Sequence, residues 1–242
     1  MSWLWREDGY ELFANRDELR TRGIALPPAI RERAGVSYIA PADADFGGTW
    51  IAINQFGISF CLLNRPRKRD YGSARSRGLL VLDLTPQPTV QATSEQLQRE
   101  NLRPYPPFAL AVLGPAQEPL VFEWDGEELR VDQVERPPYL LTSSSFDPGG
   151  VAQNRIRQFV EVRGVAFDAN SRAELMALHR SHAPEAGPYS VCMHRDDAET
   201  VSFSHVVVDG EKITFSYTPA APCKAATAAV TTLPMVRPNS LA

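Results

Sequence analysis

Cysteine is scarce in this sequence: the chain has 3 cysteines, and they are widely spaced. A domain stapled by disulfides needs several closely spaced cysteines, so the sequence excludes that class and fits a reducing compartment. No apolar run approaches the length of a membrane-spanning helix. The N-terminus also lacks the basic region and apolar core of a signal peptide. We therefore expect a cytoplasmic protein with no membrane span.

Positive charge is in short supply as well. Lys and Arg together number 25 against 29 Asp and Glu, which gives a formal net charge of −4 at pH 7. Proteins that bind nucleic acid usually carry an excess of Lys and Arg, so we expect no nucleic-acid partner. The sequence has no Gly-rich phosphate-binding loop either. It makes no prediction of an oligomer.

Hairpin signals are frequent. Asp8-Gly9 lies between the apolar runs 2–5 and 10–14, and both residues of such a pair tolerate positive φ, so a hairpin is predicted there. We expect this hairpin to lie centrally in a sheet. Its second strand then ends at Asn15-Arg16-Asp17-Glu18.

The remaining segments group into blocks of strands and blocks of helices. Strands are predicted at 49–54, 58–63, 108–113, 120–124, 129–134, 139–142, 189–194, 200–208 and 212–217, and helices at 76–84, 93–101, 151–162 and 171–182. Residues 19–48, which contain two adjacent prolines, are predicted to form a long ordered loop. In helix 151–162, Ile156, Phe159 and Val160 share one face. Many hairpins with clustered helices predict antiparallel sheets in an α+β fold.

The polar stretch after the first hairpin is the strongest candidate site. Arg16 offers a planar fork of donors suited to a carboxylate or an oxyanion, and Asp17 and Glu18 can orient it. From these residues alone, a solvated charged turn is the alternative. Gly47-Gly48-Thr49-Trp50 follows about thirty residues later, where the glycine pair indicates a tight backbone before a strand.

Three ordered motifs together resemble the NRDE family, also called the transport and Golgi organisation protein 2 family. They are Leu-Phe-x-Asn-Arg-Asp-Glu at 12–18, Gly-Gly-Thr-Trp-Ile-Ala-Ile-Asn-x-x-Gly at 47–57 and Leu-Leu-Asn-Arg at 62–65. The match is dense over residues 2–66 and traceable to about residue 217. The resemblance implies an N-terminal-nucleophile (Ntn) hydrolase-like fold, similar to penicillin acylases and bile-salt hydrolases. That fold is a four-layer αββα sandwich of two antiparallel sheets with helices outside.

The resemblance also implies a mechanism. In Ntn hydrolases the nucleophile is the first residue of the mature chain, and its own α-amino group is the base. Family members usually begin Met-Cys, whereas this chain begins Met1-Ser2-Trp3. They place Cys-Thr-Val directly before the stretch that matches Ser2-Trp3-Leu4. We therefore expect that Met1 stands in place of Val, that the native start lies three residues earlier, and that the chain as given lacks its nucleophile.

The site residues follow from the same resemblance. Asn15, Arg16 and Asp17 are expected beside the nucleophile, holding the thiolate and the substrate, and which residue of 15–18 fills each role stays open. Asn64 is expected to donate to the oxyanion. Glu18 and Ser143 complete the predicted substrate and oxyanion site, with Ser143 at a position that is usually Asn. Arg16, Asp17 and Asn64 are expected to converge on one pocket.

No metal site is predicted. His179 and His182 lie three residues apart at a helix end, but no carboxylate or cysteine partner is identifiable, so solvated histidines are favoured. Cys61 and Cys192 are predicted to be buried, inert thiols. Cys223 falls in the segment 219–242, which is rich in Ala, Thr and Pro and is predicted to be a poorly ordered tail after a single domain at 1–218.

Two function classes remain. The first is an N-terminal-cysteine amide (C–N) hydrolase or acyltransferase that acts on a small acylated substrate and needs no cofactor. The second is a non-enzymatic carrier or chaperone for an apolar ligand, with haem or an acyl lipid as the ligand that the resemblance suggests. The motifs favour the first class, and the missing cysteine and Ser143 favour the second.

Overall fold

The computed structural model describes residues 1–66, 74–134, 139–163 and 171–238. The strands in this part of the chain are β1 Ser2–Arg6, β2 Gly9–Leu19, β3 Leu26–Arg33, β4 Val36–Ala42, β5 Ile51–Asn54, β6 Ser59–Asn64, β7 Phe108–Leu113, β8 Leu120–Trp124, β9 Leu129–Gln133, β10 Tyr139–Leu140, β11 Ala198–Val208, β12 Lys212–Thr218 and β13 Ala229–Pro234. The helices are α1 Arg77–Leu84, α2 Val90–Arg99, α3 Pro148–Arg163 and α4 Ser171–Arg180. None of these helices is both long and apolar enough to cross a membrane.

The strands form two antiparallel sheets. A six-stranded sheet has the order β10-β1-β2-β11-β12-β13, and a seven-stranded sheet has the order β3-β4-β5-β6-β7-β8-β9. The predicted N-terminal hairpin is present, with Ser2 opposite Phe13 and Arg6 opposite Gly9. Its second strand pairs with β11 and therefore lies inside the six-stranded sheet, as expected.

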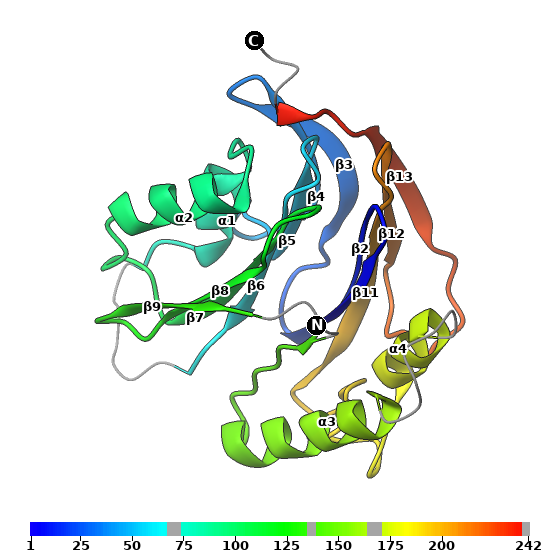
Figure 1. Cartoon of the computed structure of the whole chain (residues 1–242). Helices are drawn as coiled ribbons and strands as arrows, with labels where there is room; N and C mark the ends of the chain where they lie inside the picture. The colour runs from blue at the N-terminus through cyan, green and yellow to red at the C-terminus, as the bar shows by residue number, and fades with distance from the viewer. Residues whose placement is uncertain (67–73, 135–138, 164–170, 239–242) are drawn as a thin grey trace.

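Four layers result, with the two sheets face to face and helices on both outer surfaces (Figure 1). Helices α1 and α2 cover the seven-stranded sheet, and α3 and α4 cover the six-stranded sheet. The core between the sheets is apolar and includes Trp3, Leu12, Ile53 and Phe215. The structure therefore has the α+β class and the αββα order that the resemblance implied.

Residues 19–48 differ from the predicted loop, because they contain the β3–β4 hairpin. Ala34 and Gly35 both have positive φ, which suits a tight two-residue connection between strands. The adjacent prolines at 27 and 28 fall where the β3–β4 register shifts, on a strand at the sheet edge. Proline is tolerated at such positions because no ladder hydrogen bond is lost.

Three further predictions fail in the described residues. Residues 189–194 form no strand, and His194 makes only an isolated bridge to Glu199. In α3, Ile156 and Val160 are exposed and only Phe159 of the predicted face is buried. The tail predicted from residue 219 contains β13, which pairs along its length with β12; its residues 239–242 lie outside the described part.

Candidate active site

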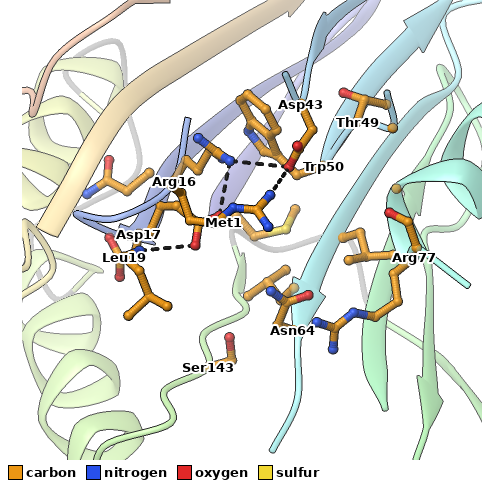
Figure 2. A pocket seen from close by; sticks show the side chains of 18 of the residues that line it. Met1, Arg16, Asp17, Leu19, Asp43, Thr49, Trp50, Asn64, Arg77 and Ser143 are labelled. Atoms are coloured by element: carbon orange, nitrogen blue, oxygen red, sulfur yellow. Dashed lines mark hydrogen bonds and ion pairs between the residues drawn. The ribbon is translucent and has the colours of Figure 1, made fainter. Parts of the chain in front are cut away.

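A cavity of about 490 Å³ opens at the end of the sandwich where β2 carries its polar residues. Every residue that the sequence singled out as a candidate lines it: Asn15, Arg16, Asp17, Glu18, Asn64 and Ser143. The walls also include the loop before β5, the start of α1, and side chains from α3 and α4. In Figure 2, Arg16 reaches the cavity from β2 and Asn64 from β6, the two strands belonging to different sheets.

Strand alternation divides the polar motif between the two faces of β2. Leu12 and Ala14 pack in the core between the sheets, whereas Phe13 packs toward α4. Because side chains alternate along a strand, Arg16 and Glu18 face the seven-stranded sheet, and Asn15 and Asp17 face the outer helices. Their hydrogen-bond partners, described below, agree with this division.

Arg16 is held on the inner side by two carboxylates and an aromatic ring. Its Nη2 lies 3.0 Å from Glu18 Oε2 and 3.6 Å from Asp43 Oδ2, and its guanidinium carbon lies 4.2 Å from the centre of the Trp50 ring. The side chain is 9% exposed. Glu18 thus orients Arg16, and the guanidinium keeps one face toward the cavity for an anionic group.

Asp17 has different partners from those expected. Its Oδ1 accepts a 2.6 Å hydrogen bond from Thr200 Oγ1 on β11, and its Oδ2 lies 3.5 Å from Arg155 Nη2 on α3. Arg155 is nearly buried and also donates to the Ser190 carbonyl and to Thr142 Oγ1. Asp17 therefore does not orient Arg16, and Arg155 joins the site through it.

Asn15 binds a buried histidine. Its Nδ2 donates to the carbonyls of His179 and Val191 at 3.0 and 2.9 Å, so its Oδ1 is the acceptor that faces His179 Nδ1 at 3.0 Å. His179 Nε2 then accepts from Ser2 Oγ at 2.9 Å. Burial lowers the pKa of His179 well below its ordinary value, and the N-terminal amine, Arg155 and His205 lower it further. The imidazole is neutral in this setting.

His179 is therefore not the solvated helix-end residue that the sequence predicted. It is 1% exposed, and it lines the cavity. The Ser2, His179 and Asn15 side chains form a chain similar in order to a serine-type triad. Ser2, however, is fully buried, and it does not line the cavity in the described residues. A substrate cannot reach its hydroxyl, so this chain of hydrogen bonds serves to position Asn15.

The glycine pair of the second motif has a steric reason. Gly47 has φ +67°, in the left-handed region, and its N–H donates to the Asp43 carbonyl. A Cβ on Gly48 would lie 2.6 Å from the carbonyl carbon of Gly78 at the start of α1. Thr49 N–H donates to the Gly78 carbonyl at 3.1 Å. The pair therefore lets α1 approach β5 closely and sets the cavity wall beside Trp50.

Asn64 and Ser143 lie on the open side of the cavity. Asn64 is the last residue of β6 and is exposed, so its amide is accessible to a ligand. Ser143 is partly buried in the segment after β10, and both are labelled in Figure 2. Both residues are placed where a bound molecule could meet them.

Met1 also lines the cavity, and its amino group is buried. It donates a 2.9 Å hydrogen bond to the Leu141 carbonyl. Burial lowers its pKa to about 6, Arg155 lowers it as well, and Cys61 and Asp17 oppose that shift. Burial raises the pKa of the Cys61 thiol to about 12, and Cys61 does not line the cavity in the described residues. Cys61 is buried, as predicted.

Sequence reasoning missed Arg155 and Asp43, and it placed His179 in solvent. The signal for Asp43 was present, because it lies four residues before Gly47 of the Gly47-Gly48 motif. Arg155 and His179 gave no signal, since their partners Asp17 and Asn15 are more than 130 residues away in the chain. Only the packing of α3 and α4 on the six-stranded sheet brings them to the cavity.

Comparison with known proteins identifies both a family and a fold. A family model described as Transport and Golgi organisation 2 matches residues 5–187. No curated protein matched the chain in sequence.

Three solved structures resemble the chain over most of its length. They are penicillin V acylase from Agrobacterium tumefaciens (TM-score 0.56, 12% identity, 97% of this chain and 86% of that chain), a Caenorhabditis elegans ortholog of N-acylethanolamine-hydrolyzing acid amidase (0.61, 14%, 87% and 93%) and a mutant of the conjugated bile acid hydrolase from Clostridium perfringens (0.53, 14%, 97% and 92%). At these identities the likeness is one of fold.

Proposed function

Because this chain belongs to the Transport and Golgi organisation 2 family and has an Ntn hydrolase-like fold, we propose that a form carrying an N-terminal cysteine, which the chain as given lacks, performs amide hydrolysis or acyl transfer. The substrate is a small acylated amide. Arg16, Asp17 and Asn15 hold the reacting groups, Asn64 stabilises the oxyanion, and Glu18 and Ser143 complete the site.

The register of the first hairpin carries the proposal. Ser2 lies opposite Phe13 and Trp3 opposite Leu12. Continuing this register beyond Met1 places the residue two positions earlier opposite Arg16. Opposed residues in an antiparallel pair share a face, with Cβ atoms about 4.5–5.5 Å apart. A cysteine at that position, where the family resemblance expects it, would face the cavity beside the Arg16 guanidinium.

These groups account for every proton and bond in one reaction cycle. The cysteine α-amine takes the thiol proton, and the sulfur forms a bond to the amide carbonyl carbon. Asn64 donates to the resulting oxyanion, and loss of such a donor costs about 3 kcal/mol of transition-state stabilisation. The C–N bond then breaks as the proton passes to the leaving nitrogen, which leaves an acyl thioester. Water or an amine releases the acyl group and regenerates the thiol.

The cavity suits an acyl amide in size and lining. Its volume of about 490 Å³ is within the range of small-molecule sites. Trp50, Leu62 and Leu140 give apolar walls for an acyl group, and Arg75 and Arg77 lie with Asn64 among the lining residues. An acyl chain on the apolar wall and a polar head near the arginines would place the scissile bond between Arg16 and Asn64.

The alternative proposal is a carrier of an apolar ligand. The same apolar walls favour an acyl lipid for this role. Haem fits less well, because it needs an axial ligand of the His, Cys, Met or Tyr type. Among the described lining residues His179 already has both ring nitrogens hydrogen-bonded, which leaves the Met1 sulfur.

The test compares two forms of the protein. One is the chain as given, and the other carries Met-Cys-Thr-Val in place of Met1. We expect the extended form, after removal of its methionine, to react with a limiting amount of a thiol-directed acylating probe at one site, seen by intact mass. The form with Ala in place of the added Cys is the matched control. Equal labelling of all forms would overturn the enzyme proposal and favour the carrier.

Arg16 supplies a second arm of the test. A nearby cation lowers a thiol pKa by about 1–3 units, so Arg16→Leu in the extended form should slow labelling at pH 7 about tenfold or more. Arg99→Leu is the control, since Arg99 lies exposed on α2. Unchanged labelling in Arg16→Leu would remove Arg16 from the proposed site.

A further inference from the structure

A cluster of two histidines and two cysteines lies outside the cavity. It gathers three segments: His182 follows α4, Cys192 and His194 precede β11, and Cys223 lies in the turn after β12. One ligand atom from each residue lies within 4.8 Å of the others. We propose that His182, Cys192, His194 and Cys223 bind a divalent transition-metal ion of the zinc type.

The distances fit one ion at the centre of the four groups. Cys192 Sγ lies 3.6 Å from His194 Nε2, and Cys223 Sγ lies 3.4 Å from the same nitrogen. In a tetrahedral zinc site, with Zn–S near 2.3 Å and Zn–N near 2.0–2.1 Å, adjacent sulfur and nitrogen ligands are about 3.6 Å apart. Two thiols directed at one imidazole nitrogen also exceed what a single lone pair can accept as hydrogen bonds.

His182 provides an independent observation. Its Nε2 is buried and has no hydrogen-bond partner among the described residues. Its ring meets the His194 ring edge to face, with centroids 5.0 Å apart. A buried nitrogen without a partner costs free energy, and a bound ion would remove that cost. The orphaned nitrogen therefore marks the fourth corner of the same site.

The surroundings of His194 match those of a metal ligand. Its Nδ1, on the side of the ring away from the cysteines, lies 3.7 Å from Glu199 Oε2. Glu199 is held by Arg20 at 2.9 Å and by Lys224 at 3.4 Å. Metal-bound histidines usually direct their second nitrogen at a carboxylate, which fixes the ring and raises its basicity.

Backbone hydrogen bonds hold the segments together before any ion binds. Cys192 N–H donates to the Ser181 carbonyl at 3.0 Å, Thr200 N–H donates to the Met193 carbonyl at 2.8 Å, and Lys224 N–H donates to the Ala221 carbonyl at 2.9 Å. The first bond places Cys192 beside His182, and the third shapes the turn that presents Cys223. Cys223 is exposed, so an ion has a route into the site.

The chemical type of the four ligands determines which ion they bind best. Two thiolates and two imidazoles in a tetrahedral arrangement suit zinc rather than magnesium or calcium, which prefer oxygen ligands. Binding releases the two thiol protons to solvent, and the two thiolates neutralise the charge of the ion. Four protein ligands close the coordination shell, which makes the site structural and leaves no position for a substrate.

The ion would brace one wall of the cavity. The segment between His182 and His194 supplies the Val191 carbonyl, which accepts from Asn15, and the Ser190 carbonyl, which accepts from Arg155. Fixing both ends of this segment to one ion limits its movement relative to β2. The site therefore acts on the cavity through Asn15 and Arg155, and the metal proposal stands whether or not the cavity is catalytic.

The first experiment measures binding directly. The full chain is purified with reductant, stripped with a chelator, and titrated with Zn²⁺ against a chromophoric competitor. We expect one ion per chain. Co²⁺ should give the thiolate charge-transfer absorption and the intense visible bands of a tetrahedral site. Absence of competition, or a cobalt spectrum without thiolate bands, would overturn the proposal.

Variants locate the ion. Cys223→Ser and His182→Gln should weaken Zn²⁺ binding by more than the roughly 10–100-fold that loss of an outer-shell partner costs. Cys61→Ala is the matched control, because it removes a thiol from β6 and should leave binding unchanged. Circular dichroism checks the fold of each variant, and Cys223 is exposed, so its variant should fold normally.

A disulfide between Cys192 and Cys223 is the competing explanation for the proximity of the two thiols. Intact mass of the reduced protein, followed by the same zinc titration, separates the two. Equal weakening in Cys61→Ala and Cys223→Ser, or no binding by the fully reduced chain, would overturn the metal site. Tight binding that Cys223→Ser and His182→Gln each abolish establishes it.

Discussion

The two outer helical layers of the sandwich pack on their sheets through different kinds of contact. Between the seven-stranded sheet and helices α1 and α2 lies a large apolar cluster, which includes Phe60 and Phe122 of the sheet and Leu80 and Leu97 of the helices. Under α3 and α4, a smaller apolar cluster is interrupted by buried polar groups. Those polar groups include Ser2, Glu11, Asn154, Arg155, Gln158 and His179.

Because their contacts differ, the two layers contribute differently to the structure. Apolar burial is strong but not directional, so the α1–α2 layer stabilises the fold mainly without directional contacts, and Asn54 is its hydrogen-bonded exception. Hydrogen bonds are directional, and the α3–α4 layer uses them to hold Asn15, Asp17 and His179 at the cavity. Four experiments, from the largest expected effect to the smallest, test this division.

Phe60→Ala should have the largest effect. Phe60 is fully buried under α1 and α2, and truncation of such a residue costs about 3–5 kcal/mol of unfolding free energy. Urea unfolding should show the same loss at pH 7.5 and pH 5.5, because this cluster is apolar. Phe146→Ala, at an exposed phenylalanine, should cost under about 1 kcal/mol. A strongly pH-dependent loss in Phe60→Ala would contradict the comparison.

Glu11→Gln tests the polar layer. The Glu11 carboxylate is fully buried and contacts Arg6, Arg172 and His205 at 2.6–2.8 Å. Burial raises its pKa, but hydrogen bonds from His205, Arg172 and Arg6 outweigh burial and lower the pKa to about 2. Neutralising one partner of a buried ionic group costs about 2–3 kcal/mol here, since Arg172 is half exposed.

The pH dependence of that loss gives its check. The folded pKa of Glu11 lies below its ordinary value of 4.5. Its stabilisation is therefore present above pH 4.5 and disappears as the pH falls toward 2. Urea midpoints of wild type and Glu11→Gln should differ at pH 7 and converge below pH 4.5. Parallel curves throughout would show that the carboxylate charge does not contribute.

Asn15→Ala and Asn54→Ala form a matched pair, one in each layer. Both asparagines bridge a sheet strand to the helical segments, Asn54 by donating to the Thr85 and Gln87 carbonyls. Each loss leaves buried groups unpaired and should cost about 2 kcal/mol. Hydrogen exchange should accelerate at residues 187–194 only in Asn15→Ala. Acceleration of that segment in Asn54→Ala would show that the layers are not independent.

Acid should weaken the polar layer by the smallest amount. The folded pKa of His179 lies well below its ordinary 6.5, so the unfolded chain binds a proton that the folded chain does not, and stability falls as the pH drops below 6.5. The Met1 amine acts in the same direction, but only between pH 8 and about 6. Between pH 6 and pH 5 the expected loss from His179 is about 1 kcal/mol. Burial also lowers the pKa of His194, which acts in the same direction, so the difference between wild type and His179→Gln gives the His179 contribution.

His179→Gln should remove the His179 contribution to the fall in stability between pH 6 and pH 5. The measurement is the urea midpoint of wild type and variant at pH 6.0, 5.5 and 5.0, all above the ordinary Glu11 pKa of 4.5. A wild-type midpoint that stays constant over this range would mean that His179 is protonated in the folded state.

The features that the sequence could predict are those that depend on residues close together in the chain. The Asp8-Gly9 hairpin, the β5–β6 hairpin and the apolar strands β7 and β8 follow local rules, and the structure confirms them. The resemblance led to Asn15–Glu18 and Asn64, because these residues lie in contiguous motifs. All of these predictions depend on neighbours in sequence.

The failures depend on partners far away in the chain. The sequence placed Ile156, Phe159 and Val160 on one helix face, but Ile156 and Val160 are exposed. Arg155 is buried instead, and it donates to the Ser190 carbonyl. His179 was predicted in solvent because its acceptor on β2 is 164 residues away. Neither partner leaves a periodic signal, so local pattern cannot find them.

The strand order also dictates when the site can form during synthesis. The seven-stranded sheet comes from the contiguous stretch β3 to β9, whereas the six-stranded sheet joins β1 and β2 to β11, β12 and β13 near the other end of the chain. Val236 N–H then donates to the Gln55 carbonyl and ties the last strand to the other sheet. During synthesis, the edge of β2 that pairs with β11 stays unpaired until β11 leaves the ribosome. The candidate site therefore cannot form until β11 has been synthesised and has paired with β2.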